Sequence, residues 1–214
     1  MPDLYFDSLR LKMGMGGRFI VRLVTYVSYG SLAAAGLTLI FAELRWMQSL
    51  GIFIALFLID RLLHFNQAEK KLTLVTESDK VNLNYYISSS AFGILEKSVD
   101  KATFLGGDVF LWLAKQCLLN QSVRKKLLHM NVHWKEFEKK IDELLKNDLK
   151  NRSSKKQVLD SVRVLVITTG RQAIINQCEY IKPEDLFINL AQMESLILNQ
   201  LLSSFELKQK LSLC

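Results

Sequence analysis

Proline and cysteine are scarce in this chain of 214 residues, which contains two Pro and three Cys. Proline interrupts helices and marks tight turns, and its scarcity therefore favours long helices. The cysteines are far apart in sequence and form no CxxC pair, which excludes a disulfide-rich scaffold and a zinc site built from thiolates. These cysteines are Cys117, Cys178 and Cys214.

Several motifs of enzymes are absent as well. No GxxxxGK[ST] segment occurs, so these residues contain no phosphate-binding loop of an ATPase, and no GxSxG segment marks a nucleophilic serine. His129 and His133 are four residues apart, but no third metal ligand accompanies them. We therefore expect no enzyme activity, no cofactor and no metal site in these residues.

Hydrophobic residues make up 50% of the chain, which excludes disorder as its overall state. Two long apolar runs near the N-terminus account for part of this share. Residues 19–41 contain one charge, Arg22, and would form a helix of roughly 34 Å, enough to cross a hydrocarbon core of about 30 Å. The second run, 46–65, is uncharged as far as Ile59 and then includes Asp60 and Arg61, which must pair or reach the headgroups.

These runs predict a transmembrane helical hairpin within residues 1–65. A buried hairpin of a soluble core, a cleaved signal peptide and a hairpin that enters one leaflet are the alternatives, and the short second arm keeps the last of these open. Basic residues lie before the first run and after the second, whereas the intervening loop has only Arg45 beside Glu43. Under the positive-inside rule, both termini are expected in the cytoplasm.

The rest of the chain has the character of a soluble helical domain. Residues 66–80 are polar with a short apolar island, and we interpret them as a linker. Residues 81–214 are amphipathic, and a basic connector, residues 146–157, divides them. The connector carries much of the net charge of +7, but a solvated loop explains it without nucleic acid.

The two parts on either side of the connector resemble each other, over residues 84–145 and 158–207. Each contains an amphipathic helix, an aromatic–aliphatic pair, two turn residues, an acid and an apolar helix. The pairs are Phe104-Leu105 and Tyr180-Ile181, and the acids are Asp108 in the first part and Glu184 and Asp185 in the second. Because one such unit cannot bury its apolar face alone, we predict an all-α domain with pseudo-twofold symmetry and about four helices per half.

This doubled unit resembles the Clp amino-terminal repeat domain, found at the front of Clp-family AAA+ unfoldases. The family unit has a helix, an aromatic-Ile pair, Gly-Thr-Glu-His and a run of leucines. Residues 180–186, YIKPEDL, fit this pattern well, and residues 104–110, FLGGDVF, fit it less well. The likeness covers residues 84–207. Asp108 stands where the family has Glu, and Val109 replaces the polar residue that follows.

The resemblance implies a domain that binds protein substrates or adaptors and delivers them to an AAA+ unfoldase. The chain would be a partner of such an ATPase, or the N-terminal part of one. In some relatives the acid at the turn–helix junction contacts a phosphorylated arginine, which would assign substrate binding to Asp108, Glu184 and Asp185. Helix capping explains the same acids without any ligand. The alternative function is a membrane scaffold whose helical domain associates with itself.

Overall fold

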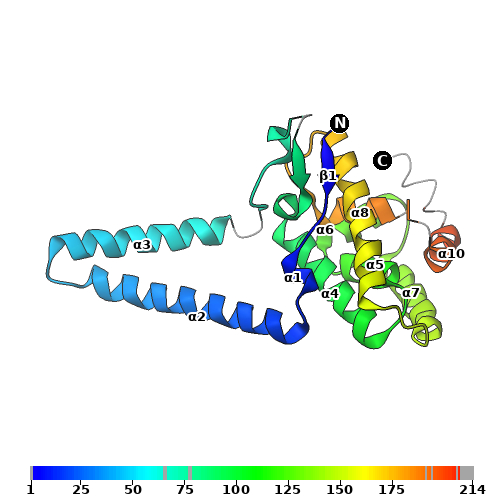
Figure 1. Cartoon of the computed structure of the whole chain (residues 1–214), viewed down its shortest axis with the longest axis horizontal. Helices are drawn as coiled ribbons and strands as arrows, with labels where there is room; N and C mark the ends of the chain where they lie inside the picture. The colour runs from blue at the N-terminus through cyan, green and yellow to red at the C-terminus, as the bar shows by residue number, and fades with distance from the viewer. Residues whose placement is uncertain are drawn as a thin grey trace. The chain divides into compact units, whose positions relative to one another are not determined.

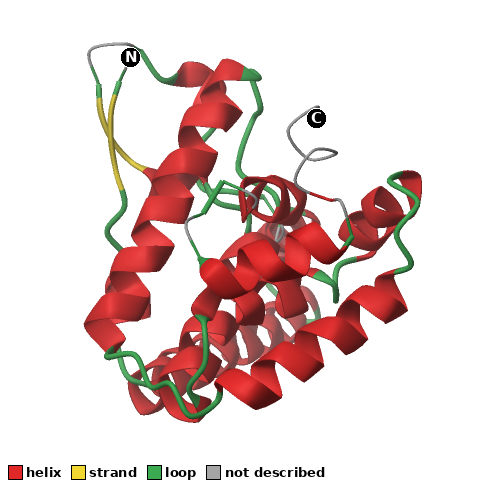
Figure 2. Cartoon of the chain, turned by 90° about the vertical axis from the view of Figure 1, so that its right-hand side faces the viewer, coloured by secondary structure: helices red, strands yellow, loops and turns green. Residues whose placement is uncertain are grey.

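The fold is mostly helical in the computed structural model, which describes residues 2–64, 67–76, 79–190, 192–193, 195–205 and 207. Figure 2 shows helices through most of the chain and two short strands side by side. Over these residues the prediction of an all-α fold is therefore confirmed, apart from one small sheet. Phe65, Cys214 and the rest of 208–214 lie outside the described residues. The α-helices are α1 (Leu9–Lys12), α2 (Met15–Ile40), α3 (Arg45–Leu63), α4 (Ser89–Leu105), α5 (Val109–Cys117), α6 (Gln121–His129), α7 (Trp134–Asp148), α8 (Lys155–Ile175), α9 (Pro183–Leu190) and α10 (Leu196–Ser204).

Helices α2 and α3 form an antiparallel hairpin within residues 12–67, one of two compact units of the chain (Figure 1). Residues 16–40 and 45–63 are each long and apolar enough to span a membrane, with mean hydropathies of 1.5 and 1.6. Only 6% of either segment is buried within the protein. Large side chains such as Tyr26, Phe53 and Trp46 are exposed. The prediction of two long apolar helices is confirmed.

Two glycines allow the hairpin helices to approach closely. A Cβ on Gly51 would lie 2.6 Å from the backbone N of Ile40 and 2.8 Å from the carbonyl oxygen of Gly36. A Cβ on Gly36 would in turn lie 3.0 Å from Cγ2 of Ile54. Small residues at such a crossing are typical of helix pairs in membranes, because they bring the two backbones into contact.

The polar groups of the hairpin are largely satisfied within its own helices. The hydroxyls of Thr25 and Thr38 donate to the carbonyls of Val21 and Ala35, at 2.8 and 2.9 Å. Near the end of α3, His64 Nδ1 lies 3.0 Å from Asp60 Oδ1. This contact gives Asp60 the partner that an acid near the end of an apolar helix requires.

The second unit combines residues 1–11 with residues 68–214, so the hairpin is an insertion near the start of a helical domain. Strand β1 (Asp3–Tyr5) pairs in parallel with β2 (Lys80–Asn82). Phe6 and Leu11 are buried in the domain core, at 5% and 1% exposure. The sequence had grouped all of residues 1–65 with the hairpin; residues 1–11 instead belong with the helical domain, because their apolar side chains complete its core.

Part of the segment interpreted as a linker, 66–80, is packed on the domain. Leu72 is buried at the start of the 3-10 helix η1 (Leu72–Leu74), and its N–H donates to the carbonyl of Glu179 at 2.7 Å. The neighbouring Lys71 forms an exposed ion pair with the Glu179 carboxylate at 2.9 Å. This stretch is therefore attached to the domain surface rather than free.

Four helices, α4, α5, α8 and α9, form the centre of the domain. Helix α4 packs on α5 and on α8, while α9 packs on α5 and on α8. Ser88 caps α4, and Ser154 caps α8 with a full capping box to Gln157. Gly170 permits the close approach of Leu83 in the 3-10 helix η2 (Leu83–Tyr86), because a Cβ would lie 2.5 Å from Leu83 Cδ1.

The loops between these helices bond in a crossed pattern. Between α4 and α5, the N–H of Gly107 donates to the carbonyl of Asn151, three residues before the cap of α8. Between α8 and α9, the N–H of Ile181 donates to the carbonyl of Tyr86, two residues before the cap of α4. Each loop is thus bonded to the segment that enters the other helix pair.

The outer helices complete the core. Helix α6 packs on α9, and α10 packs on α5 and α7. Helix α7 carries an apolar stripe that faces inward, with Phe137, Ile141 and Leu145 buried and Leu144 half-buried. The Phe137 ring makes edge contacts with Phe187 of α9, at 6.1 Å between centroids. After the connector, the described residues contain three α-helices, α8 to α10, rather than the four predicted for each half.

Candidate protein-binding groove

An open groove of about 640 Å³ lies between α6 and the start of α9. Ser122, Lys125, Lys126, His129 and Met130 line it from α6 and the residue that follows α6, and Lys182, Glu184 and Asp185 line it from the start of α9. Two of the three acids selected from the sequence therefore lie in a surface groove.

Asp185 has a structural role at the beginning of α9. It is the third residue of the helix, and its Oδ2 accepts a hydrogen bond from the N–H of Lys182 at 2.8 Å. Burial raises the pKa of the Asp185 carboxyl and the charge of Glu184 adds to the rise, while the hydrogen bond from Lys182 opposes it. Pro183 suits the first position of the helix, where an N–H would have no partner in the helix.

Glu184 is the acid of this group that is positioned to meet a ligand. It is half-buried on the first turn of α9, where the positive end of the helix dipole favours a carboxylate. Its charge also contributes to the raised pKa of the buried Cys117 thiol. A carboxylate in an open groove can accept hydrogen bonds from an ammonium or guanidinium group of a bound peptide.

Asp108 is instead occupied by contacts inside the domain. It is the N-cap of α5, where its Oδ1 accepts from the N–H of Phe110 at 2.7 Å, and its Oδ2 accepts from the hydroxyl of Ser195. Burial raises the pKa of Asp108 and the charge of Asp148 acts in the same direction, while the bonds from Ser195 and Phe110 oppose the rise. These contacts favour capping over ligand binding.

The predicted acids are not equivalent in position. Asp108 is the residue immediately before the first residue of α5, and it caps that helix. The equivalent position before α9 is occupied by Lys182. Glu184 and Asp185 are the second and third residues of α9 and have Phe110 and Leu111 as their counterparts in α5. The two turn–helix junctions therefore place their acids at different positions relative to the start of the helix.

Sequence reasoning missed the basic residues of the groove. Lys125 and His129 are four apart on α6, so they share a face, and Lys126 lies beside them. The two lysines of α6 and Lys182 place positive charge in the groove that Glu184 and Asp185 line. The i, i+4 spacing in the sequence could have indicated this face, but not that α9 lies opposite it.

The cysteines and histidines have structural explanations. Cys117 is fully buried, its Sγ lies 3.9 Å from the carbonyl oxygen of Pro183, and burial raises its pKa to about 12. A thiol with such a pKa is not a nucleophile at neutral pH. His129 ends α6 and His133 precedes α7, so they do not share one helix. In the part of the chain that the structure describes, no three His, Cys, Asp or Glu side chains converge as metal ligands.

The comparisons with known proteins add no relative to this picture. No family model matches the chain, and neither a curated protein nor a solved structure matches it significantly.

Proposed function

We propose that this chain is a membrane-anchored module that captures protein substrates or adaptors for an AAA+ unfoldase. It would lie at the inner membrane of a bacterium, with both ends of the hairpin and the helical domain in the cytoplasm. Its own residues would bind and deliver rather than catalyse. The proposal joins the apolar hairpin with the likeness of the helical domain to the Clp amino-terminal repeat domain.

The crossed bonding of the two loops carries the proposal. The N–H of Gly107 donates to the segment just before α8, and the N–H of Ile181 donates to the segment just before α4. The pair α4–α5 and the pair α8–α9 therefore make equivalent contacts with each other. The outer helices repeat this exchange, since α6, which follows α5, packs on α9, and α10, which follows α9, packs on α5. Reciprocal packing of this kind is expected of a duplicated unit with a pseudo-twofold axis. A duplicated helical unit is the feature that the resemblance requires.

The pairing of β1 with β2 supports the hairpin topology. Residues 3–5 precede the hairpin, residues 80–82 follow it, and the two strands are hydrogen-bonded. Strands that pair must lie on the same side of a bilayer. Helices α2 and α3 must therefore both cross the membrane or both stay out of it. Together with the basic flanks Arg10, Lys12 and Arg61, this favours two crossings with both flanks in the cytoplasm.

The experiment that tests binding uses a photo-crosslinking amino acid in the full chain, in cells. Replacing His129 places the crosslinker in the groove, and replacing Lys139 places it on the exposed side of α7. We expect groove-specific adducts with an AAA+ unfoldase, its adaptor or its clients. Glu184→Gln should reduce them at least fivefold, whereas Glu138→Gln, a neutralised acid on α7, should not.

Two other results would contradict the proposal. Adducts only between copies of this chain would favour the scaffold function, and equal adducts from both positions would show no role for the groove. Anchorage has a separate test, because a spanning hairpin keeps the protein in the membrane pellet after alkaline carbonate extraction. Release into the supernatant would refute the transmembrane hairpin and leave the binding result standing.

A further inference from the structure

Three large apolar side chains are exposed at one edge of the helical domain. Phe104 and Leu105 end α4 and are 57% and 54% exposed, and Leu149 follows α7 and is 38% exposed. Exposed apolar side chains that share one surface often mark a contact with a partner or a membrane.

The backbone brings together the two segments that carry these three side chains. Gly106 follows Leu105 directly, and a Cβ on Gly106 would lie 2.5 Å from the carbonyl oxygen of Leu149. The N–H of Gly107 donates to the carbonyl of Asn151 at 2.8 Å. Both glycines have φ values in the left-handed region, +86° and +84°, which other residues rarely adopt. The end of α4 and the connector thus form a fixed platform.

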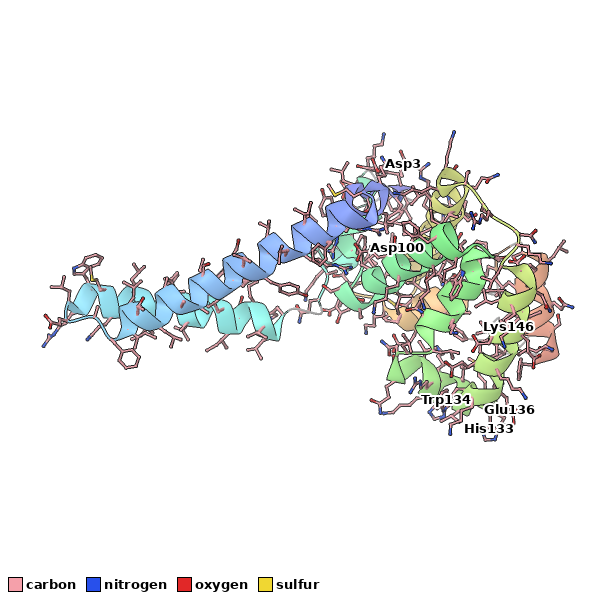
Figure 3. The ribbon with its side chains drawn as sticks, turned by 90° about the horizontal axis from the view of Figure 1, so that it is seen from below. Asp3, Asp100, His133, Trp134, Glu136 and Lys146 are labelled. Carbon is pink, nitrogen blue, oxygen red and sulfur yellow. The ribbon has the colours of Figure 1, made fainter. Side chains whose placement is uncertain are left out.

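The same platform carries a dense positive charge. Residues 146–157 contain five basic side chains and one acid, Asp148. Asp148 is 5% exposed, and its carboxylate accepts from the N–H of Asp108 at 2.6 Å and from Asn151 Nδ2 at 2.7 Å. Its negative charge is therefore directed into the fold, while the basic side chains are exposed or, in one case, half-buried; they are Lys146, Lys150, Arg152, Lys155 and Lys156. Figure 3 shows Lys146 toward the opposite end of α7 from Trp134.

We propose that this connector surface, made of Phe104, Leu105, Leu149 and the basic side chains of residues 146–157, docks on the anionic lipid surface of a membrane. Basic residues near such a surface are attracted to acidic headgroups, and exposed apolar side chains enter the boundary between headgroups and acyl chains. Two of the three apolar side chains, Leu105 and Leu149, are aliphatic and cannot stack on bases, which favours lipid over nucleic acid as the ligand of this surface. The proposal rests on the membrane anchorage proposed above, which holds the domain close to lipid.

The test uses the full chain in vesicles, with one environment-sensitive fluorophore. Cys178→Ser and Cys214→Ser leave Cys117 as the remaining native cysteine, and Cys117 is fully buried. Ser153→Cys then places an NBD label in the connector. In vesicles of phosphatidylcholine with 30% phosphatidylglycerol, we expect a blue shift and quenching by doxyl lipids. In vesicles of pure phosphatidylcholine, or in 0.5 M NaCl, the emission of the label should stay at the wavelength typical of water and should not be quenched by doxyl lipids.

Matched variants separate docking from anchorage. Each basic residue near an anionic surface is worth about a fivefold change in partitioning, so Lys150→Gln with Arg152→Gln should lower the docked-to-undocked ratio about 25-fold. Leu149→Ser should reduce doxyl quenching. Lys139→Gln with Lys140→Gln removes equal charge from α7 and should change neither signal. All variants should still float with the vesicles, because the hairpin is intact.

Three results would overturn the proposal. The label could report water in every vesicle although the protein floats. It could give the same shift in neutral and anionic vesicles, which would exclude headgroup recognition. It could also respond to added poly(A) RNA in neutral vesicles and not to anionic lipid, which would assign the surface to nucleic acid. Failure to float would instead refute the anchorage on which the proposal rests.

Discussion

The ion pair between Arg10 and Glu96 offers a quantitative test of how the first residues are held to the helical domain. Arg10 Nε lies 2.8 Å from Glu96 Oε1, and the Arg10 guanidinium lies 5.3 Å from the centre of the Phe92 ring. The Glu96 side chain is 1% exposed and that of Arg10 is 48% exposed. Arg10→Met keeps a flexible apolar stem and removes the cation.

The expected loss follows from this unequal burial. Removing one partner of a fully buried pair costs about 3–5 kcal/mol, because a carboxylate stays in a poorly solvated place. Arg10 is half in water, and solvent screens part of its attraction, so we expect a loss of about 2–3 kcal/mol in the free energy of unfolding. That is a large share of the 5–15 kcal/mol typical of a domain. Adding Glu96→Gln to Arg10→Met should recover most of it, since the carboxylate that Arg10 neutralises is then removed as well.

Urea unfolding of the full chain in detergent micelles, followed by tryptophan fluorescence, measures the effect. The matched control is Lys140→Met, which breaks an exposed pair with Glu143 at 3.2 Å and should cost less than 1 kcal/mol. The slope of the unfolding free energy with urea should not change in either variant. If Arg10→Met costs no more than the control, or if Glu96→Gln gives no recovery, the ion pair does not hold the N-terminal segment.

Other substitutions test the hairpin, the core and the cap. Gly51→Leu should speed amide exchange along α3 in micelles, because its Cβ would meet the Ile40 backbone at 2.6 Å, whereas Gly30→Leu, with no atom within 4 Å, should not. Phe137→Ala, at a side chain with 0% exposure, should lower the free energy of unfolding by about 3–5 kcal/mol in urea titrations. Asp108→Asn retains an acceptor for the cap. Because burial raises the Asp108 pKa in the folded state, the wild-type protein loses stability as the carboxyl ionises, so the variant should gain stability relative to wild type between pH 4 and pH 7 in the same titrations.

Local signals predicted the helices well. The two apolar runs correspond to α2 and α3 within a few residues. A long apolar run forms a helix because a helix satisfies the backbone hydrogen bonds within the segment itself. Phe137, Ile141 and Leu145 recur every four residues, a spacing typical of the buried face of a helix, and their side chains are buried. In both cases the information lies within a few helical turns.

Contacts between distant residues were not predictable in the same way. The first eleven residues look like a flank of the hairpin, and nothing local shows that Asp3 pairs with Lys80 or that Leu11 is buried. The acids of the site were found as a pattern, but their roles depend on partners far away. Asp108 is occupied by Ser195, 87 residues later, whereas Glu184 lies opposite α6.

The parallel pairing of β1 with β2 has a consequence for biosynthesis. Strand β1 leaves the ribosome before the apolar hairpin, yet its partner, Lys80–Asn82, is made only after that hairpin. The domain therefore cannot close this sheet until α2 and α3 have been synthesised. The domain thus matures only after the hairpin has been made. The apolar side chains of Phe6 and Leu11, which are buried in the finished core, await their partners during that interval, when a chaperone can bind them.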